Sequence, residues 1–113
     1  MSCIFCQIAA GEVSCEKVYE DGSVIAFKDL NPVAPIHILV IPKDHIESTN
    51  YIGHSNSGIV SKIFEVIAQL SRDGTLGNGE YRVVTNCGGS AGQSVKHLHF
   101  HVIAGRNMEW PPG

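Results

Sequence analysis

The sequence has few charged residues, few aromatic residues and no long apolar run. Asp, Glu, Lys and Arg make up 17% of its 113 residues and Phe, Trp and Tyr 7%, whereas hydrophobic residues make up 43%. That hydrophobic content is sufficient for a packed core and excludes a disordered chain. No stretch approaches the roughly 18 apolar residues of a membrane span, and no basic segment followed by an apolar core opens the chain. We therefore expect a cytoplasmic protein without a membrane partner.

Positive charge is also scarce. Eight Lys and Arg residues oppose eleven Asp and Glu residues, which gives a formal net charge of −3 and a pI of about 6.0. Nonspecific binding to a phosphate polymer needs a basic surface, so we expect no nucleic-acid partner. The length suits one hydrophobic core, and we expect residues 1–113 to form a single domain. Two residue types are in excess, with twelve glycines and six histidines.

Cysteine occurs four times in a pattern that does not suggest two disulfides. Cys3 and Cys6 form a C-x-x-C motif, whereas Cys15 and Cys87 stand alone and are expected to be small buried residues. In a reducing compartment a C-x-x-C motif is a redox pair or half of a metal site. A redox pair follows a core strand, and no strand fits before residue 3, so a metal site is favoured over a redox pair. A metal site is also favoured over a pair of ordinary buried thiols. Two histidines would complete a tetrahedral zinc site, but the spacing leaves open which two.

Apolar periodicity predicts a short and a long helix. Residues 3–11 (CIFCQIAAG) are expected to form a helix that begins at Ser2 and buries Ile4, Phe5 and Ile8. The long helix follows the polar residues 50–58 and ends at Asp73-Gly74. Its candidate N-caps are Ser55, Asn56 and Ser57, and its core-facing or dimer-facing stripe comprises Ile59, Val60, Ile63, Phe64, Ile67 and Leu70.

Five segments are typical of strands. Residues 17–21 and 24–29 flank an Asp21-Gly22 turn and predict a hairpin, and residues 36–42 (IHILVIP) predict a central strand after a proline-paced loop over residues 31–35. Residues 81–85 and 98–104 predict two more strands, joined by a glycine-rich loop over residues 86–94. Short links between these segments indicate an α+β fold with an antiparallel sheet, one face of which the long helix covers.

Three histidines alternate with apolar residues in the segment 97–103 (HLHFHVI). Residues i, i+2 and i+4 of a strand share a face, so His97, His99 and His101 would lie roughly 6–7 Å apart. Leu98 and the other apolar positions would then face the core. A solvated strand face does not explain three histidines in strict alternation, so the row is a candidate functional site.

Such a row has three chemical uses: a metal site, nucleophilic catalysis, or binding of an anion by imidazolium. The preceding loop discriminates among them. Residues 88–94 (GGSAGQS) are small and flexible, and their backbone N–H groups can surround an anion, although they do not match the Walker pattern. Placed directly before the histidines, this loop indicates a phosphate held against an imidazole.

Residues 92–102 (GQSVKHLHFHV) resemble the signature of the histidine triad (HIT) family. The segment 105–113 (GRNMEWPPG) resembles the C-terminal tail of its Hint branch, the nucleoside phosphoramidases, and residues 27–32 and 34–43 are also similar. The resemblance therefore covers most of the chain. It implies a HIT-like fold, with a five-stranded antiparallel sheet, one long helix and a short N-terminal helix, assembled as a homodimer.

The resemblance also implies an activity. The family binds purine nucleoside monophosphates or their phosphoramidates and cleaves a bond at the α-phosphorus. By position, His99 would be the nucleophile, and its attack would form a nucleotidyl-histidine intermediate that water hydrolyses. The ring N–H of His99 would donate a hydrogen bond to a backbone carbonyl. His101 would lie beside the phosphate, and Ser94 and His37 would complete the catalytic set.

Nucleotide-binding residues are carried over in the same way. Asp29 would accept hydrogen bonds from the ribose hydroxyls, and Gln93 and Ser94 would bind the phosphate and leaving group. An apolar slot for the base would comprise Ile4, Phe5, Ile8, Phe27 and Leu30. The remaining contacts would come from Asn86, Gly92, Val95 and the two histidines His99 and His101, and from Trp110, whose tail reaches toward the partner's site.

The cysteine pair departs from the animal phosphoramidases and resembles zinc-containing microbial HIT proteins. In those proteins the pair is joined by the histidine of a P-K-x-H segment and by the first histidine of the triad. Here these are His45 and His97, so the resemblance implies one zinc per chain held by Cys3, Cys6, His45 and His97. Four protein ligands leave no open position, so the ion would be structural. Asp44 and His54 are expected to be exposed and without a role.

Three other functions are weighed against an enzyme acting through His99. A zinc-stabilised nucleotide-binding or regulatory module is the principal rival, and the intact triad with Gln93 and Ser94 favours the enzyme over it. A catalytic metal bound by the triad alone would leave Cys3 and Cys6 unexplained. A dinucleoside polyphosphate hydrolase is a variant of the leading hypothesis that the Hint-like tail disfavours.

Overall fold

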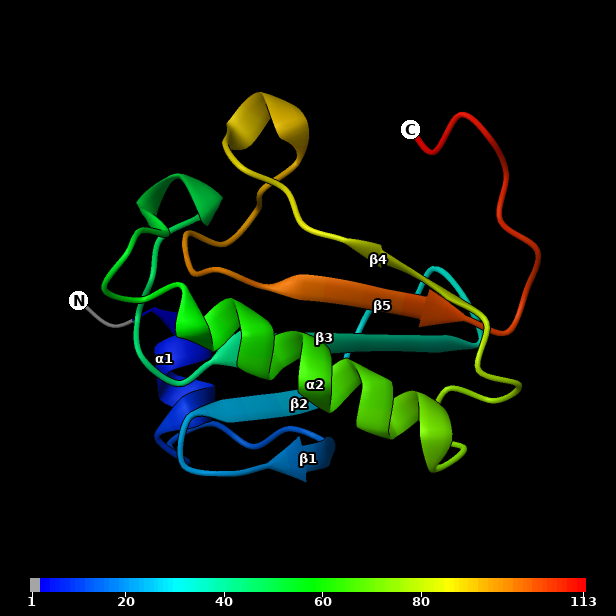
Figure 1. The fold of residues 1–113 in the computed structure, drawn as a ribbon, viewed down its shortest axis with the longest axis horizontal. Helices are drawn as coiled ribbons and strands as arrows, with labels where there is room; N and C mark the ends of the chain where they lie inside the picture. Colours follow the sequence, from blue (N-terminus) through cyan, green and yellow to red (C-terminus); the bar gives the residue numbers. More distant parts are fainter. Residues whose placement is uncertain (1–2) are drawn as a thin grey trace.

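The computed structural model describes residues 3–113, so the predicted helix start at Ser2 lies outside the described residues. Five strands form one antiparallel sheet in the order β1-β2-β3-β5-β4. The elements are α1 (Ile4–Ala9), β1 (Lys17–Glu20), β2 (Val24–Lys28), β3 (Ile36–Pro42), η1 (Thr49–Tyr51), α2 (Gly58–Arg72), β4 (Tyr81–Val84), η2 (Gly89–Ala91) and β5 (Phe100–Ala104) (Figure 1). This arrangement confirms the α+β fold with one long and one short helix.

The two faces of the sheet are buried by different helices. Alternating residues of each strand point to opposite faces, so the strands divide their side chains between two hydrophobic cores. The larger core lies under α2 and includes Val24, Ala26, Ile38, Val40, Leu98, Phe100 and Val102. The smaller core lies under α1 and consists of Phe5, Ile8, Ile25, Phe27, Leu39 and Ile41. The smaller core is the one beside the histidines.

The last strand is shorter than predicted. β5 begins at Phe100 and not at Leu98, because the backbone N–H of Leu98 donates to the carbonyl of Ile46 (2.6 Å) outside the sheet. The hydroxyl of Thr85 donates to the carbonyl of His99 (2.8 Å) and fixes the backbone at this point. The alternation of the segment nevertheless persists, because Leu98, Phe100 and Val102 are buried under α2 as expected.

The helices differ from the prediction at their ends. α1 is six residues long, shorter than residues 3–11, and Ile4 is 42% exposed and not buried. α2 begins after Ser57, whose side chain makes no capping hydrogen bond, and Phe64 of the apolar stripe is 46% exposed. The turn η2 lies within the glycine-rich segment 86–94, which was expected to be a loop, and η1 begins one residue before the polar segment 50–58. In the described part of the chain, neither helix has the length and apolar character needed to traverse a bilayer.

Candidate functional site

The middle histidine is held in one tautomer by the backbone. Nδ1 of His99 lies 2.7 Å from the carbonyl oxygen of His97, which can only accept a hydrogen bond, so Nδ1 carries a proton and, in the neutral ring, Nε2 has the lone pair. Among residues 3–113, every fully buried side-chain nitrogen or oxygen has a hydrogen-bond partner. Nε2 of His99 has none, so it reaches open space although the residue is only 3% exposed. An imidazole in this state is a competent nucleophile.

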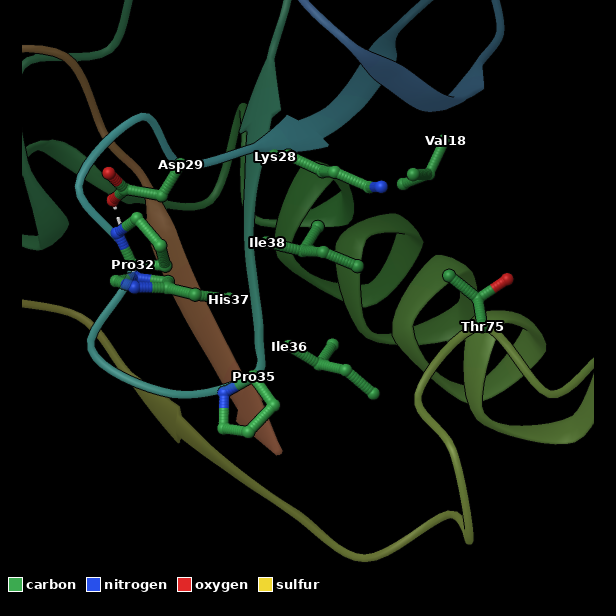
Figure 2. Close-up of a pocket in the computed structure, with 9 residues that line it drawn as sticks. All are labelled: Val18, Lys28, Asp29, Pro32, Pro35, Ile36, His37, Ile38 and Thr75. Carbon is green, nitrogen blue, oxygen red and sulfur yellow. Dashed lines mark ion pairs between the residues drawn. The ribbon is translucent and has the colours of Figure 1, made fainter. Parts of the chain in front are cut away.

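A second chain of hydrogen bonds orients the third histidine. The backbone N–H of Val33 donates to Nδ1 of His37 (3.1 Å), so the proton of neutral His37 is on Nε2. That Nε2 lies 2.9 Å from Nδ1 of His101 and 3.3 Å from Oδ2 of Asp29, a contact drawn as a dashed line in Figure 2. Nδ1 of His101 therefore accepts, and its Nε2 carries a proton. The imidazoles of His99 and His101 have centroids 5.1 Å apart, which brings an acceptor and a donor together.

Burial favours the neutral form of His37 and of His101. It lowers the pKa of His37 below its ordinary value, against the opposing charge of Asp29. Burial also lowers the pKa of His101, and the neighbouring His99 and His37 add to the effect while Asp29 opposes it. A second proton on His101 would place two N–H groups against each other along the bond to His37. The hydrogen-bond directions and the lowered pKa values thus describe the same neutral state.

His99 and His101 open onto a cavity of about 400 Å³ between α1 and one face of the sheet. The volume lies in the range of small-molecule sites. Most of its wall is apolar, and its polar lining includes Asp29, Ser94, His99 and His101. The predicted site residues that line it are Ile4, Phe5, Ile8, Phe27, Asp29, Leu30, Ser94, Val95, His99 and His101.

The other expected site residues lie outside this lining. The side chain of Gln93 is engaged within its own loop, because its amide nitrogen donates to the carbonyls of Glu47 (2.7 Å) and Val95 (3.0 Å) and its oxygen accepts from the N–H of Gly88 (2.9 Å). Gln93 thus organises the glycine-rich loop in this state. His37 lies behind His101. Asn86 donates weakly to the carbonyl of Gly92 (3.5 Å), and Trp110 is 83% exposed.

Part of the wall was not predicted. Leu39 lines the cavity from β3, and its place could have been found from the alternation that puts it on the same face as His37. The segment 13–16 and Asn31 also line the cavity from loops. Loop residues carry no periodic signal, so the sequence alone did not single them out.

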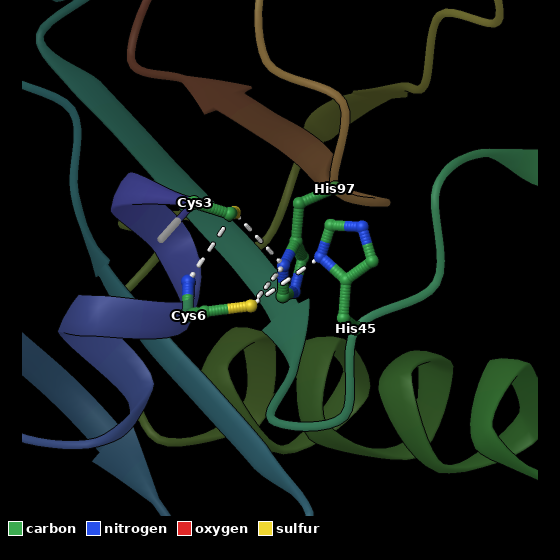
Figure 3. Close-up of side chains that lie close together, drawn as sticks. All are labelled: Cys3, Cys6, His45 and His97. Atoms are coloured by element: carbon green, nitrogen blue, oxygen red, sulfur yellow. Dashed lines mark hydrogen bonds between the residues drawn. The ribbon is translucent and has the colours of Figure 1, made fainter. Parts of the chain in front are cut away.

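A second cluster lies at the other end of the histidine row. Cys3 and Cys6 face His45 and His97 (Figure 3), and one ligand atom from each of the four lies within 4.8 Å of the others. Nδ1 of His97 lies 3.4 Å from Sγ of Cys3 and 3.5 Å from Sγ of Cys6, and Nδ1 of His45 lies 3.3 Å from Sγ of Cys6. The predicted metal ligands are therefore brought together.

The geometry of this cluster fits a tetrahedral ion. Zn–S bonds of about 2.3 Å and Zn–N bonds of about 2.0 Å place sulfur and nitrogen about 3.5 Å apart. Both thiols approach the same Nδ1 of His97, and one nitrogen cannot serve two hydrogen bonds of that kind, whereas one ion can be shared. Nε2 of His97 lies 2.9 Å from the carbonyl of Pro42, the partner that commonly orients a metal-bound histidine. The cluster can therefore hold a metal ion.

The remaining cysteines and exposed residues have simpler surroundings. Cys15 and Cys87 are half-buried free thiols, less buried than expected. Asp44 and His54 are exposed, as expected. They contribute to neither cluster.

Asp29, His37 and His101 form another group with ligand atoms close together, but their hydrogen bonds exclude a metal there. The N–H of Val33 occupies Nδ1 of His37, so a metal on Nε2 would require an imidazolate. A smaller cavity of about 220 Å³ lies beyond this group (Figure 2). His99 does not line it, and its volume is below the range of cofactor sites. The larger cavity is therefore the candidate binding site.

Comparisons with known proteins show the family of the chain. Residues 2–110 match the protein family described as "Scavenger mRNA decapping enzyme C-term binding". An uncharacterized HIT-like protein of Chlamydia muridarum is 44% identical over 93% of this chain and 82% of its own. The chain belongs to the histidine triad family. Within its HIT signature, Ser94, Val95, His99 and His101 line the cavity, and His97 belongs to the cluster that can hold a metal ion.

Solved HIT structures show the same fold. A HIT family hydrolase from Legionella pneumophila is 40% identical, with a TM-score of 0.94 over 99% of this chain and all of that one. A histidine triad protein from Clostridium difficile is 50% identical, with a TM-score of 0.91 over 96% of this chain and 95% of that one. Both cover nearly the whole of this HIT protein.

Proposed function

We propose that this protein is a nucleotide-binding hydrolase that cleaves purine nucleoside phosphoramidates at the α-phosphorus through His99. The observation that carries the proposal is the fixed tautomer of His99, whose unprotonated Nε2 opens into the cavity. The apolar wall of that cavity suits a base, and the carboxylate of Asp29 suits ribose hydroxyls. The similarity to a HIT family hydrolase supports a hydrolytic activity.

The hydrogen bonds of His99 and His101 support one order of steps. The lone pair on Nε2 of His99 attacks the α-phosphorus, and the bond from phosphorus to the leaving nitrogen breaks. The N–H of His101 at Nε2 donates a hydrogen bond to that nitrogen, which takes up a proton from solvent and leaves as a neutral amine. Water then attacks the phosphorus of the nucleotidyl-histidine and releases one proton to solvent. Cleavage of the phosphorus–nitrogen bond restores His99 and releases the nucleoside monophosphate.

Replacement of the nucleophile tests this function. We expect His99→Asn to abolish hydrolysis of adenosine 5′-phosphoramidate and to leave AMP affinity within a few-fold, because the cavity keeps its other walls. His54→Ala, at an exposed histidine in neither cluster, should behave as wild type. Turnover by His99→Asn at the wild-type rate would refute the nucleophile. AMP affinity without turnover in the wild-type protein would instead favour a zinc-stabilised nucleotide-binding module.

We also assign one structural zinc per chain to Cys3, Cys6, His45 and His97. Bound there, the ion would cross-link α1 to the segment before β5, and with four protein ligands it supplies no reactive water. We expect elemental analysis to find about one zinc per chain, and Cys3→Ser to lose the ion and stability together. Metal-free protein with full stability would contradict the assignment.

We further propose a branch of the family, an oligomeric state and a location for this protein. We place the chain in the Hint-like branch of the zinc type, acting as one domain over residues 1–113. Exposed apolar side chains at Phe64, Tyr81 and Trp110 support a homodimer, which light scattering can test. Thiolate ligands require a reducing compartment, which supports a cytoplasmic location.

A further inference from the structure

The short helix α1 belongs to two sites at once. Cys3, its N-cap, and Cys6 belong to the metal cluster, in which they face His45 and His97 (Figure 3). Residues of the same six-residue helix, Phe5 and Ile8 among them, line the candidate nucleotide cavity. No other helix of the described chain lines this cavity, so the position of α1 decides the shape of one wall.

Phe5 connects the two sites directly. Its ring packs edge-on against the metal-cluster histidine His97 (centroids 5.8 Å apart) and against the proposed nucleophile His99 (5.1 Å). It also packs against Phe27 of the cavity wall (5.8 Å). Edge-on contacts of this kind fix ring orientation as well as burying area. Phe5 therefore restrains the ring plane of His99, while the carbonyl of His97 fixes its tautomer.

α1 cannot hold this position by its own stability. Isolated helices shorter than about 12 residues are marginal in water. Only Phe5 and Ile8 of α1 are buried, and the hydrogen bond from the N–H of Cys6 to Sγ of Cys3 is long, at 3.4 Å. The two thiols add contacts to distant parts of the chain, through His45 and His97. An ion bound there would convert weak contacts into a cross-link.

We propose that α1 couples the metal cluster to the nucleotide pocket, with Phe5 in contact with both sites. An ion held by Cys3 and Cys6 fixes the helix that forms the pocket wall, so nucleotide affinity depends on metal occupancy. By linkage, bound nucleotide must raise the affinity for the metal by the same factor. The inference rests on the proposed nucleotide site, but it does not require His99 to react.

Calorimetric titration with AMP tests the coupling. We expect chelation of zinc to weaken AMP binding by about tenfold, within the usual range of coupling between sites, and added zinc to restore it. Zinc affinity, measured by competition with a chromogenic chelator, should rise about tenfold when AMP is saturating. Equal AMP affinity with and without zinc would overturn the coupling and leave the proposed function intact. Failure of zinc-loaded protein to bind AMP would overturn the proposed function and the coupling with it.

Two exposed histidines provide a matched pair of variants. His45 is a ligand of the cluster and lines no part of the nucleotide cavity, whereas His54 belongs to neither. We expect His45→Ala to weaken AMP binding at limiting zinc and excess zinc to rescue it, and His54→Ala to leave binding unchanged. Equal behaviour of the two variants would refute transmission through α1.

Hydrogen exchange separates coupling from general stabilisation. On removal of zinc, we expect amide protection to fall across α1 (residues 4–9) and to persist in β3 and β5. Nucleotide added to the zinc-free protein should restore part of that protection. Loss of protection throughout the sheet would show an ion that supports the whole fold, and would overturn a coupling specific to α1.

Discussion

His37 makes no contact with the candidate cavity, yet its loss should slow the reaction. Its Nδ1 accepts from the N–H of Val33, and its Nε2 donates to Nδ1 of His101. In His37→Leu the ring of His101 loses the donor that fixes its tautomer. The proton of His101 can then move to Nδ1, away from the leaving group. The variant should therefore lose catalysis while the pocket wall is retained.

The size of the loss follows from one unsatisfied acceptor. Leaving a buried acceptor without a partner costs about 1–3 kcal/mol. Applied to the transition state, this predicts a fall in kcat of about 5- to 150-fold. His37→Gln keeps an amide that can donate toward His101, so it should recover part of the loss. AMP affinity should change by less than about threefold in both variants, because His37 does not line the cavity.

Steady-state hydrolysis of adenosine 5′-phosphoramidate and AMP titration together measure both quantities. ¹⁵N chemical shifts of the His101 ring report its tautomer directly. Wild-type kcat in His37→Leu, with the proton of His101 still on Nε2, would refute the orienting role of His37. A loss of AMP affinity equal to the loss of kcat would show that His37 supports the shape of the pocket and not the orientation of the N–H of His101.

Two further predictions concern stability. Burial lowers the pKa of His37 and His101 from 6.5, so the unfolded state binds more protons than the folded state below that pH. The free energy of unfolding should therefore fall as the pH drops from about 7.5 to 5.5. Urea titrations should show a smaller fall for His37→Leu than for the wild-type protein. A pH-independent stability would contradict the neutral pair. Gly105 has φ +92°, and a Cβ there would lie 3.0 Å from Cβ of Pro35, so Gly105→Ala should destabilise the fold by about 1–3 kcal/mol, whereas Gly53→Ala should not.

Periodicity was enough to predict most of the fold. The range of β3 agrees with the prediction to the residue, because apolar β-branched residues followed by proline define both its character and its end. The start of β5 could not be predicted in this way. It depends on the hydrogen bond of Leu98 to Ile46, a residue 52 positions away in the sequence. Exposure of Phe64 on α2 likewise depends on how much of the helix the sheet can cover.

The reactive groups of the candidate site were predictable, whereas its hydrogen bonds and packing contacts were not. The alternation of histidines identified His99 and His101, and the resemblance identified the four cluster residues that the structure brings together. The engagement of Gln93 within its own loop and the contact of Phe5 with two histidines arise from tertiary packing. Neither leaves a pattern in the sequence, because each depends on side chains from distant segments meeting.

The interleaving of Leu98, Phe100 and Val102 with the three histidines gives strand register a chemical meaning. Side chains of this segment alternate between the α2 core and the reactive face. A slip of one residue in the pairing with β3 would bury imidazoles among hydrocarbons and present leucine and phenylalanine to the phosphate. A chain with the wrong register would therefore lack activity as well as stability. The activity of a sample would then measure the fraction of its molecules that folded in the correct register.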